Sequence, residues 1–270
     1  RSVAGLIFGN NSTATAAISM LTGTNLNRLN IGASGILMNS QSGAATLGSG
    51  GSTQGVQLGA SQSWTNNSSS LLTVASVSGQ TAGQNYVLTF DGSGSGGTTI
   101  TNVIRNDHFE VNTGTVSLVI NTSGGVTTLA NSNTFSGDTT LTSGTLALTN
   151  SNALANSALN TAGTGTVTTN QSGLTFGGLK GSRNISSVIT SGYSSVTGLA
   201  LNPLSGTSTY TGIISNGAAT TSLTKSGAGT QILEGANTYS GVTNINAGVL
   251  GVTSLGNGSA ASTLGASGTA

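Results

Sequence analysis

The densest group of ionisable side chains is the run RNDHFE at positions 105–110, which contains the only histidine of the chain. In an extended strand Asp107 would face one side, and His108 and Glu110 the other. An imidazole beside carboxylates could act in acid–base catalysis or bind a cation. One short stretch alone, however, gives incomplete metal coordination. The simpler interpretation is a solvated lateral loop or a patch that touches a neighbouring chain. We therefore treat Arg105, Asp107, His108 and Glu110 as candidate ligand or partner contacts, and predict no catalytic residue, cofactor or metal.

Two further features could bind ligands. Trp64, the single tryptophan, is a candidate for an exposed side chain that stacks on a sugar or contacts a partner. Gly92, Gly94 and Gly97 have the spacing of a dinucleotide-binding fingerprint, but that motif must open a helix. The residues at 98–101 are Thr-Thr-Ile-Thr, which favour a strand, so we interpret the glycines as a loop.

The composition excludes several classes of protein. Of the 270 residues only 4% are charged and 43 are glycine, and the net charge is +1, so there is no clustered charge to hold nucleic acid. Cysteine is absent, which removes disulfides and thiolate metal sites. The longest apolar runs are too short to span a bilayer. With one proline and a mean hydropathy of +0.13, the chain favours β-structure over disorder.

The elements that position these residues come from an internal repeat. The sequence NTFSG at 133–137 returns as NTYSG at 237–241, an offset of 104 residues. After it, a glycine precedes a short strand in which leucines alternate with small residues, so each unit has one apolar face. Such short strands cannot bury that face alone and must stack on neighbouring coils. The repeat-defining positions are Asn133, Phe135, Gly137 and Gly144 in the first copy and Asn237, Tyr239, Gly241 and Gly248 in the second.

The residues SLTKSGAGT at 222–230, GANTYSG at 235–241 and NAGVL at 246–250 resemble the autotransporter-associated β-strand repeat. That family occurs in autotransporter passenger domains and in very large bacterial surface proteins. The resemblance implies a right-handed parallel β-helix outside the cell, secreted or attached to the outer membrane. The first copy departs from the family, because Ile-Asn-Thr-Ser at 120–123 replaces the usual Lys-Ser-Gly-like turn. Residues 78–112 do not resemble it.

We therefore predict an all-β parallel β-helix (β-solenoid) over residues 1–270, with repeats near 117–149 and 222–253 and a lateral insertion at 78–112. About 20 residues per coil would give roughly 13 coils and a rod on the order of 60 Å long. Tandem β-sandwich domains, which also repeat near 100 residues, are the alternative fold. The chain begins with Arg rather than Met, so we expect it to be a piece of a longer protein.

The first functional hypothesis is a non-catalytic structural segment, a stalk, fibre or passenger-domain spacer that stacks end to end or on flanking repeats. The second is an adhesin that binds a host or environmental glycan, or a protein, through the lateral loop at about 91–112. The third is a polysaccharide-active β-helix enzyme. It rests on fold analogy alone and needs more carboxylates than the five acidic residues present.

Overall fold

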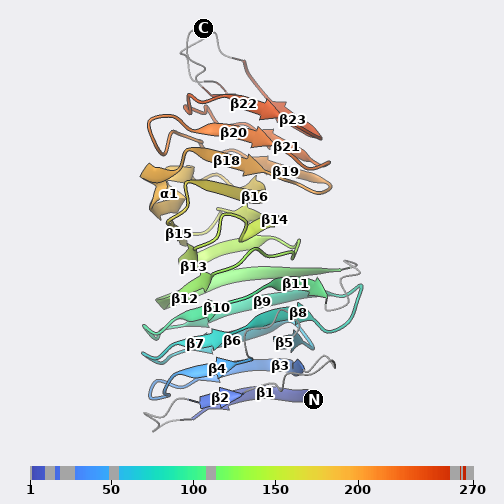
Figure 1. Cartoon of the computed structure of the whole chain (residues 1–270), viewed down its shortest axis with the longest axis vertical. Helices are drawn as coiled ribbons and strands as arrows, with labels where there is room; N and C mark the ends of the chain where they lie inside the picture. Colours follow the sequence, from blue (N-terminus) through green and yellow to red (C-terminus); the bar gives the residue numbers. More distant parts are fainter. Residues whose placement is uncertain are drawn as a thin grey trace.

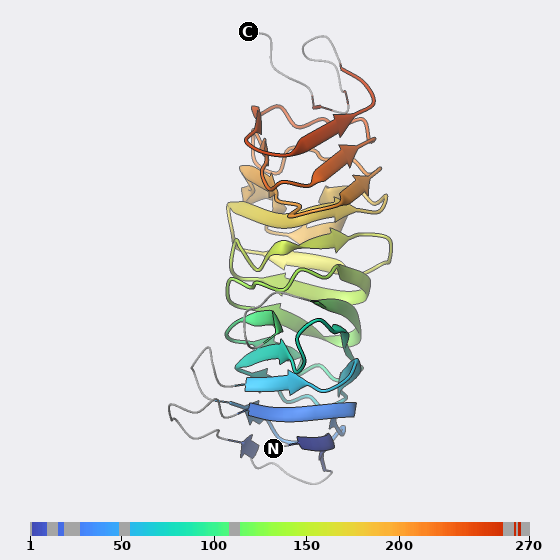
Figure 2. The ribbon, with the colours of Figure 1, turned by 90° about the vertical axis from the view of Figure 1, so that its right-hand side faces the viewer.

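The computed structural model shows a column of stacked coils with strand β1 at one end and strands β22 and β23 at the other (Figure 1). The strands cross the column and lie one above the next along its long axis (Figure 2). The residues that the structure describes are 2–9, 16–18, 28–48, 55–107, 114–255, 262 and 264–265.

The described residues are almost entirely β-structure. The strands and helices are β1 (Ser2–Phe8), β2 (Ala16–Ile18), β3 (Arg28–Met38), β4 (Ala45–Leu47), β5 (Gly55–Leu58), β6 (Gln62–Asn66), β7 (Leu72–Val74), β8 (Ser76–Gly79), β9 (Asn85–Gly92), β10 (Thr98–Ile100), β11 (Ile104–Asp107), β12 (Thr115–Leu129), β13 (Thr139–Leu148), β14 (Leu154–Asn160), β15 (Thr166–Thr169), β16 (Gly173–Lys180), α1 (Ile185–Val188), β17 (Ile189–Ser191), the 3-10 helix η1 (Tyr193–Ser195), β18 (Gly198–Leu201), β19 (Thr207–Tyr210), β20 (Ser222–Lys225), β21 (Thr230–Leu233), β22 (Thr243–Ile245) and β23 (Val249–Val252).

The pairings between these strands are parallel, and most strands pair with a strand of the coil before and one of the coil after. One ladder of neighbours can be followed through eleven levels: β1, β3, β6, β9, β12, β13, β14, β16, β19, β21 and β23. Ten steps of about 4.8 Å give this ladder a length on the order of 50 Å. A β-sandwich is built from antiparallel strands. The parallel β-helix predicted from the sequence is therefore confirmed.

Two further ladders complete each coil. One contains β2, β4, β7, β10, the last residues of β12 and β13, then β15 and β17. The other begins with the first residues of β1 and of β3 and continues through β5, β8 and β11. It reappears as β18, β20 and β22 above the first residues of β16. Long strands such as β3, β12 and β16 bend at a register shift, so that one strand contributes to two ladders.

Coil length changes along the column. Thr98 pairs with Thr127, 29 positions further along, whereas Thr145 pairs with Thr166, only 21 positions further. The predicted 20 residues per coil therefore fits only the shorter coils. Paired residues are 25 positions apart between β16 and β18 and 24 apart between β18 and β20, and they are 26 to 30 apart at most steps up to β12.

The lateral insertion predicted at 78–112 is also wrong for the part of it that the structure describes. Residues 85–92 form β9, which pairs in unbroken register with residues 115–122 of β12 and stacks on β6 below. Residues 98–100 and 104–107 likewise form β10 and β11 within the column. The segment lacks the repeat motif but keeps the alternation of buried and outward side chains, as in β9, and that alternation is sufficient for a coil. Residues 108–113 lie outside the described residues.

The core consists of the inward side chains of successive levels. In β12 the residues Val116, Leu118 and Ile120 are fully buried, and the residues between them face outward. Because the ladders are parallel and in register, Leu118 stacks on Leu88 of the coil below, and rows of apolar side chains run along the axis. No helix among the described residues is long and apolar enough to cross a bilayer.

The coil between β16 and β18 departs from pure β-structure, because it contains α1 and η1 (Figure 1). Two buried tyrosines close this region. The Tyr193 hydroxyl donates to the carbonyl of Ser215, and the Tyr210 hydroxyl donates to the carbonyl of Arg183 at 2.6 Å. Burial raises the pKa of Tyr193 to about 12, and burial together with neighbouring Tyr193 raises the pKa of Tyr210.

We predict that alkali destabilises this coil. An unfolded tyrosine has a pKa of about 10, below that of folded Tyr193. The stabilisation from its protonated hydroxyl is therefore complete below about pH 10 and is lost as the pH rises towards about 12. Thermal melts over this range should show a falling melting temperature, with a shallower fall in Tyr193→Phe. An equally steep fall in that variant would contradict the assignment.

Candidate functional site

The charged run predicted as a contact site lies only partly within the described residues. Arg105 is half-buried in β11 and pairs with Ser78 of β8. Asp107 is 1% exposed, so its carboxylate does not face solvent and is not available to an external ligand. His108 and Glu110 lie outside the described residues, so their role as candidate contacts is untested. Burial, and secondarily the nearby Arg105, lowers the pKa of Arg28.

The prediction that Trp64 is exposed is wrong. Its side chain is fully buried and packs edge-on against Phe90 of the next coil, with ring centroids 5.8 Å apart and an interplanar angle of 87°. The indole Nε1 donates to Oε1 of Gln62 at 2.9 Å, and the amide of Gln62 donates to the carbonyl of Ile31 at 2.8 Å. Trp64 has the inward phase of β6, where alternate residues are buried. Its polar atom is satisfied inside the column.

The asparagine of the repeat motif joins successive coils. Oδ1 of Asn133 accepts a hydrogen bond from the backbone N–H of Ile104 at 2.8 Å, and its Nδ2 donates to the carbonyl of Ala153 at 2.8 Å. One buried side chain thus connects the coil below to the coil above. In the second copy Asn237 is fully buried and accepts from the backbone N–H of Ile214 at 2.7 Å.

Each repeat is also held by one asparagine of the coil beneath, Asn106 for the first copy and Asn216 for the second, and the sequence analysis did not identify either. Oδ1 of Asn106 accepts from the backbone N–H of Ser136 at 2.9 Å, and Nδ2 of Asn106 donates to the Ser136 hydroxyl at 2.9 Å. Asn216 makes the same two bonds to Ser240, each 2.9 Å long. The separations are 30 and 24 residues, so a comparison at the fixed 104-residue offset does not align the two asparagines.

The glycine that ends the motif is required by the spacing of the coils. A Cβ on Gly137 would lie 2.5 Å from the carbonyl oxygen of Val116, and a Cβ on Gly241 would lie 2.4 Å from that of Thr221. Both contacts are with the backbone of the preceding coil, which cannot yield without breaking the ladder. The motif therefore marks where two coils approach most closely.

The remaining repeat positions are also structural. Phe135 and Tyr239 are each 1% exposed and fill the interior beneath the next coil. Gly144 and Gly248 have φ angles of 77° and 66°, a left-handed conformation that glycine adopts without strain. The repeat thus specifies one tight corner, the buried aromatic side chain inside that corner and the strand that follows it.

Lys225 is a buried cation that the sequence analysis did not single out. Its side chain is fully buried, and its Nζ donates to the carbonyls of Ser226, Gly227 and Ala247 at 2.6, 2.9 and 3.0 Å. Burial lowers its pKa. The ammonium group therefore closes the turn and bonds to the next coil. In the first copy Ile120 occupies the corresponding place, which explains why that copy departs from the Lys-Ser-Gly pattern.

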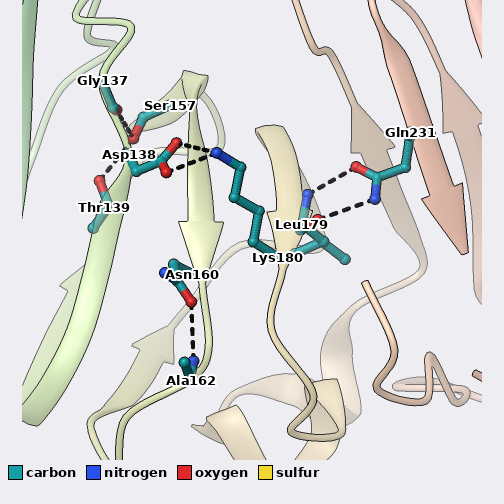
Figure 3. Close-up of polar contacts among 9 residues, drawn as sticks. All are labelled: Gly137, Asp138, Thr139, Ser157, Asn160, Ala162, Leu179, Lys180 and Gln231. Carbon is teal, nitrogen blue, oxygen red and sulfur yellow. Dashed lines mark hydrogen bonds and ion pairs between the residues drawn. The ribbon is translucent and has the colours of Figure 1, made fainter. Parts of the chain in front are cut away.

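An ion pair and a buried amide connect the middle of the column (Figure 3). Nζ of Lys180 lies 2.7 and 2.9 Å from the two carboxylate oxygens of Asp138, and the pair spans the intervening strand β14. Gln231 accepts from the backbone N–H of Leu179 at 2.9 Å and donates to its carbonyl at 3.0 Å. Because Leu179 and Ser208 are not paired, the side-chain amide of Gln231 supplies the hydrogen bonds that a neighbouring strand would give.

The described residues include no cluster of three or more histidine, cysteine or acidic side chains that could hold a metal ion. Two shallow grooves lie on outer faces. One, of about 510 Å³, lies near the N-terminal end over β3, β6 and β9. The other, of about 420 Å³, lies over β16, β18 and β20. Serine and threonine are prominent in both.

The model of the passenger-associated-transport-repeat matches the chain twice, at residues 120–148 and 223–252. The chain carries two passenger-associated-transport repeats. They coincide with the two copies found in the sequence, so the predicted family resemblance is confirmed. No curated protein and no solved structure matches the chain significantly.

The two passenger-associated-transport repeats occupy different faces of the column. Thr139 of the first copy lies in the ladder that continues through Leu159 and Leu179. Thr243, its counterpart, lies in the ladder of Leu223, which leads to the other end of β16. The repeat therefore encodes a local corner-and-strand unit that can be placed on any side of a coil.

We predict that Asn133→Ala destabilises the column by about 2–6 kcal/mol, because it leaves two buried backbone groups without partners at about 1–3 kcal/mol each. Chemical denaturation followed by circular dichroism would measure the loss, and amide exchange would locate it at Ile104 and its neighbours. Asn244→Ala, at an exposed position of β22, is the control. Equal stability of the two variants would refute the bridging role of Asn133.

The same measurement separates two classes of glycine. Gly137→Ala should cost about 1–3 kcal/mol through overpacking against the Val116 carbonyl. Gly173→Ala should cost nothing, because a Cβ there would have its nearest contact at 4.0 Å. If Gly137→Ala is as stable as Gly173→Ala, the close approach of the coils does not explain the glycine that ends the motif.

Proposed function

We propose that the chain is a structural spacer in the passenger region of a secreted or surface-attached bacterial protein, and that it performs no catalysis. The observation that carries this proposal is the stack of eleven levels of parallel strands with two passenger-associated-transport repeats built into it. Such a column has a fixed length and resists bending, because each coil hydrogen-bonds to its neighbours.

The use of the charged residues supports a structural role. Lys180 and Asp138 bond to each other across a strand, and Lys225 bonds to carbonyl groups. Arg183 donates to the carbonyls of Gly163 and Gly165 at 2.9 and 2.6 Å. A hydrolase or lyase acting on polysaccharide needs carboxylates that face a groove. In this chain Asp138 is committed to Lys180 and Asp107 is buried.

The lateral-loop form of the adhesin hypothesis receives no support from the described residues. Residues 91–107, which would have formed most of that loop, contribute to β9, β10 and β11 inside the column. A binding role would have to use an outer face of the column.

The spacer role can be tested by measuring the distance between the two ends. The chain has no cysteine, so Ser2→Cys and Asn244→Cys together accept two spin labels at exposed sites. Ten levels at about 4.8 Å predict a narrow distance distribution centred on the order of 50 Å. The distribution should be the same at low and high salt, because backbone and amide hydrogen bonds dominate the contacts between coils.

A matched pair at Asn30 and Asn244, one level closer, should shorten the distance by about 5 Å. A broad distribution, or a distance that changes with salt, would mean that the column bends. That result would rule out a rigid spacer.

A further inference from the structure

The most exposed apolar side chains of the described residues lie at the two ends of the column. β1 forms one end, and β22 and β23 form the other (Figure 1). One such side chain belongs to β1, and the others lie in or beside β22 and β23. The large apolar residues that are more than half exposed are Ile7, Val242, Ile245, Val249 and Leu255. Exposed apolar patches of this kind mark surfaces that contact a partner.

The strands at both ends also have an open edge. Within the described part of the chain, β1 pairs only with β3, β22 only with β20 and β23 only with β21. An open edge is a template for a further strand. Because every one of these pairings is parallel, a second copy placed on the last level would continue the ladders with the strand direction unchanged.

The backbone groups of β1 alternate between its two edges. The carbonyl of Phe8 accepts a hydrogen bond from the backbone N–H of Asn39 at 3.2 Å, so Phe8 faces the coil of β3. Residues of a strand face its two neighbours alternately. The backbone groups of Gly5 and Ile7 therefore face the open edge.

The backbone of β23 has the complementary alternation. The N–H of Val249 donates to the carbonyl of Gly229 at 3.3 Å, so Val249 faces the coil below and Leu250 faces the open edge. Placed opposite Leu6 of a second copy, Leu250 would donate to the carbonyl of Gly5 and accept from the N–H of Ile7. These are the groups that β1 leaves open.

The inward side chains of the last level have the spacing that already fits β1. The residues of β3 that stack on inward residues of β1 are five and then two positions apart: Ile31, Ile36 and Met38. The last level has apolar residues at the same spacing, and each pairs with a fully buried residue of the coil below: Ile245, Leu250 and Val252. A second copy could therefore lay β1 on β22 and β23 in the register that it has with β3.

The outward positions are complementary in size in this same register. Ile7, which is 72% exposed, would lie opposite Gly251, and Val249, which is 55% exposed, would lie opposite Gly5. Each branched side chain thus faces a residue that has none, so the two edges can approach without overpacking.

We propose that a second copy of this chain docks end to end, with its β1 on β22 and β23 of the first copy. The contact joins two different surfaces, so it repeats and gives a filament one column wide. The proposal does not rest on the spacer role, because it uses only the end levels. Adding excess unlabelled chain to the spin-labelled chain keeps the distance within one copy separate from distances between copies.

The first experiment follows the whole chain by sedimentation over a range of concentrations, with electron microscopy of the products. Ile7→Lys places a charge on the open edge, a substitution that blocks strand pairing. Val87→Lys is the matched control, because Val87 is exposed on β9, whose two edges are already paired with β6 and β12. Melting temperatures of both variants show whether the column still folds.

The wild type and Val87→Lys should form rods that lengthen with concentration, and Ile7→Lys should keep the monomer mass of 26.1 kDa with an unchanged melting temperature. A wild type that stays monomeric up to its solubility limit would overturn the proposal, since the ends are then covered in another way. Assembly of Ile7→Lys equal to that of the wild type, or filaments wider than one column, would also overturn it.

A second experiment tests the register by disulfide formation. The chain has no cysteine, and Ile7→Cys with Gly251→Cys places two thiols at opposite ends of one column, where they can react only between copies. Directly opposed residues lie about 4.8 Å apart, which suits a disulfide. A Cβ at Gly251 would meet only the flexible side chain of Ile232 at 3.2 Å. Oxidation should give a ladder of linked chains, and Ile7→Cys with Asn244→Cys, seven positions out of register, should not; equal yields would refute the register.

Discussion

The structure depends on the short distance between successive coils. Parallel strands hydrogen-bond at about 4.8 Å, so every residue at a corner must fit between two backbones at that separation. At Gly35 an added Cβ would lie 1.9 Å from the Ser63 carbonyl oxygen, and at Gly192 it would lie 1.8 Å from that of Thr169. The abundance of glycine is thus largely a consequence of stacking. At Gly173 and Gly198 no such backbone neighbour is close, so stacking does not require glycine there.

Stacking also leaves backbone groups at the corners without a partner in the next strand, and amide side chains satisfy them. Asn133, Asn106 and Gln231 each hydrogen-bond to backbone groups of another coil, and each is buried. A neutral amide can donate and accept at once, so it replaces a peptide group without the desolvation cost of a charge. A protein built in this way needs few charged residues for its stability. Lys225 is a buried exception, and its ammonium group donates to three carbonyls.

Each passenger-associated-transport repeat forms one such corner together with the strand that follows it. The two copies have the same asparagine supports and the same close contact at the final glycine, yet they lie on different faces of the column. Coils of different length between them place the motifs on different sides without disturbing the ladders. Outer faces can therefore vary, and the groove over β16, β18 and β20 is one place where they do.

The sequence alone determined the position of both repeats, because the motif recurs at a fixed offset, and the resemblance of that motif to a known repeat family implied the parallel β-helix. It also determined that the repeat positions are structural, since glycine and aromatic side chains in a fixed pattern have few other uses. It did not determine coil length, because the hydrogen bonds between coils form between strands and do not depend on the number of residues in the connecting turns. Residues 78–112 lack the repeat motif, and the sequence therefore predicts an insertion there, although the described part of that segment forms strands of the column. Only the tertiary structure decided that Trp64 and Asp107 face inward, and that Asn106 and Ser136, 30 residues apart, form one contact. Burial and contacts between coils depend on which strands become neighbours, and strands become neighbours only when the coils stack.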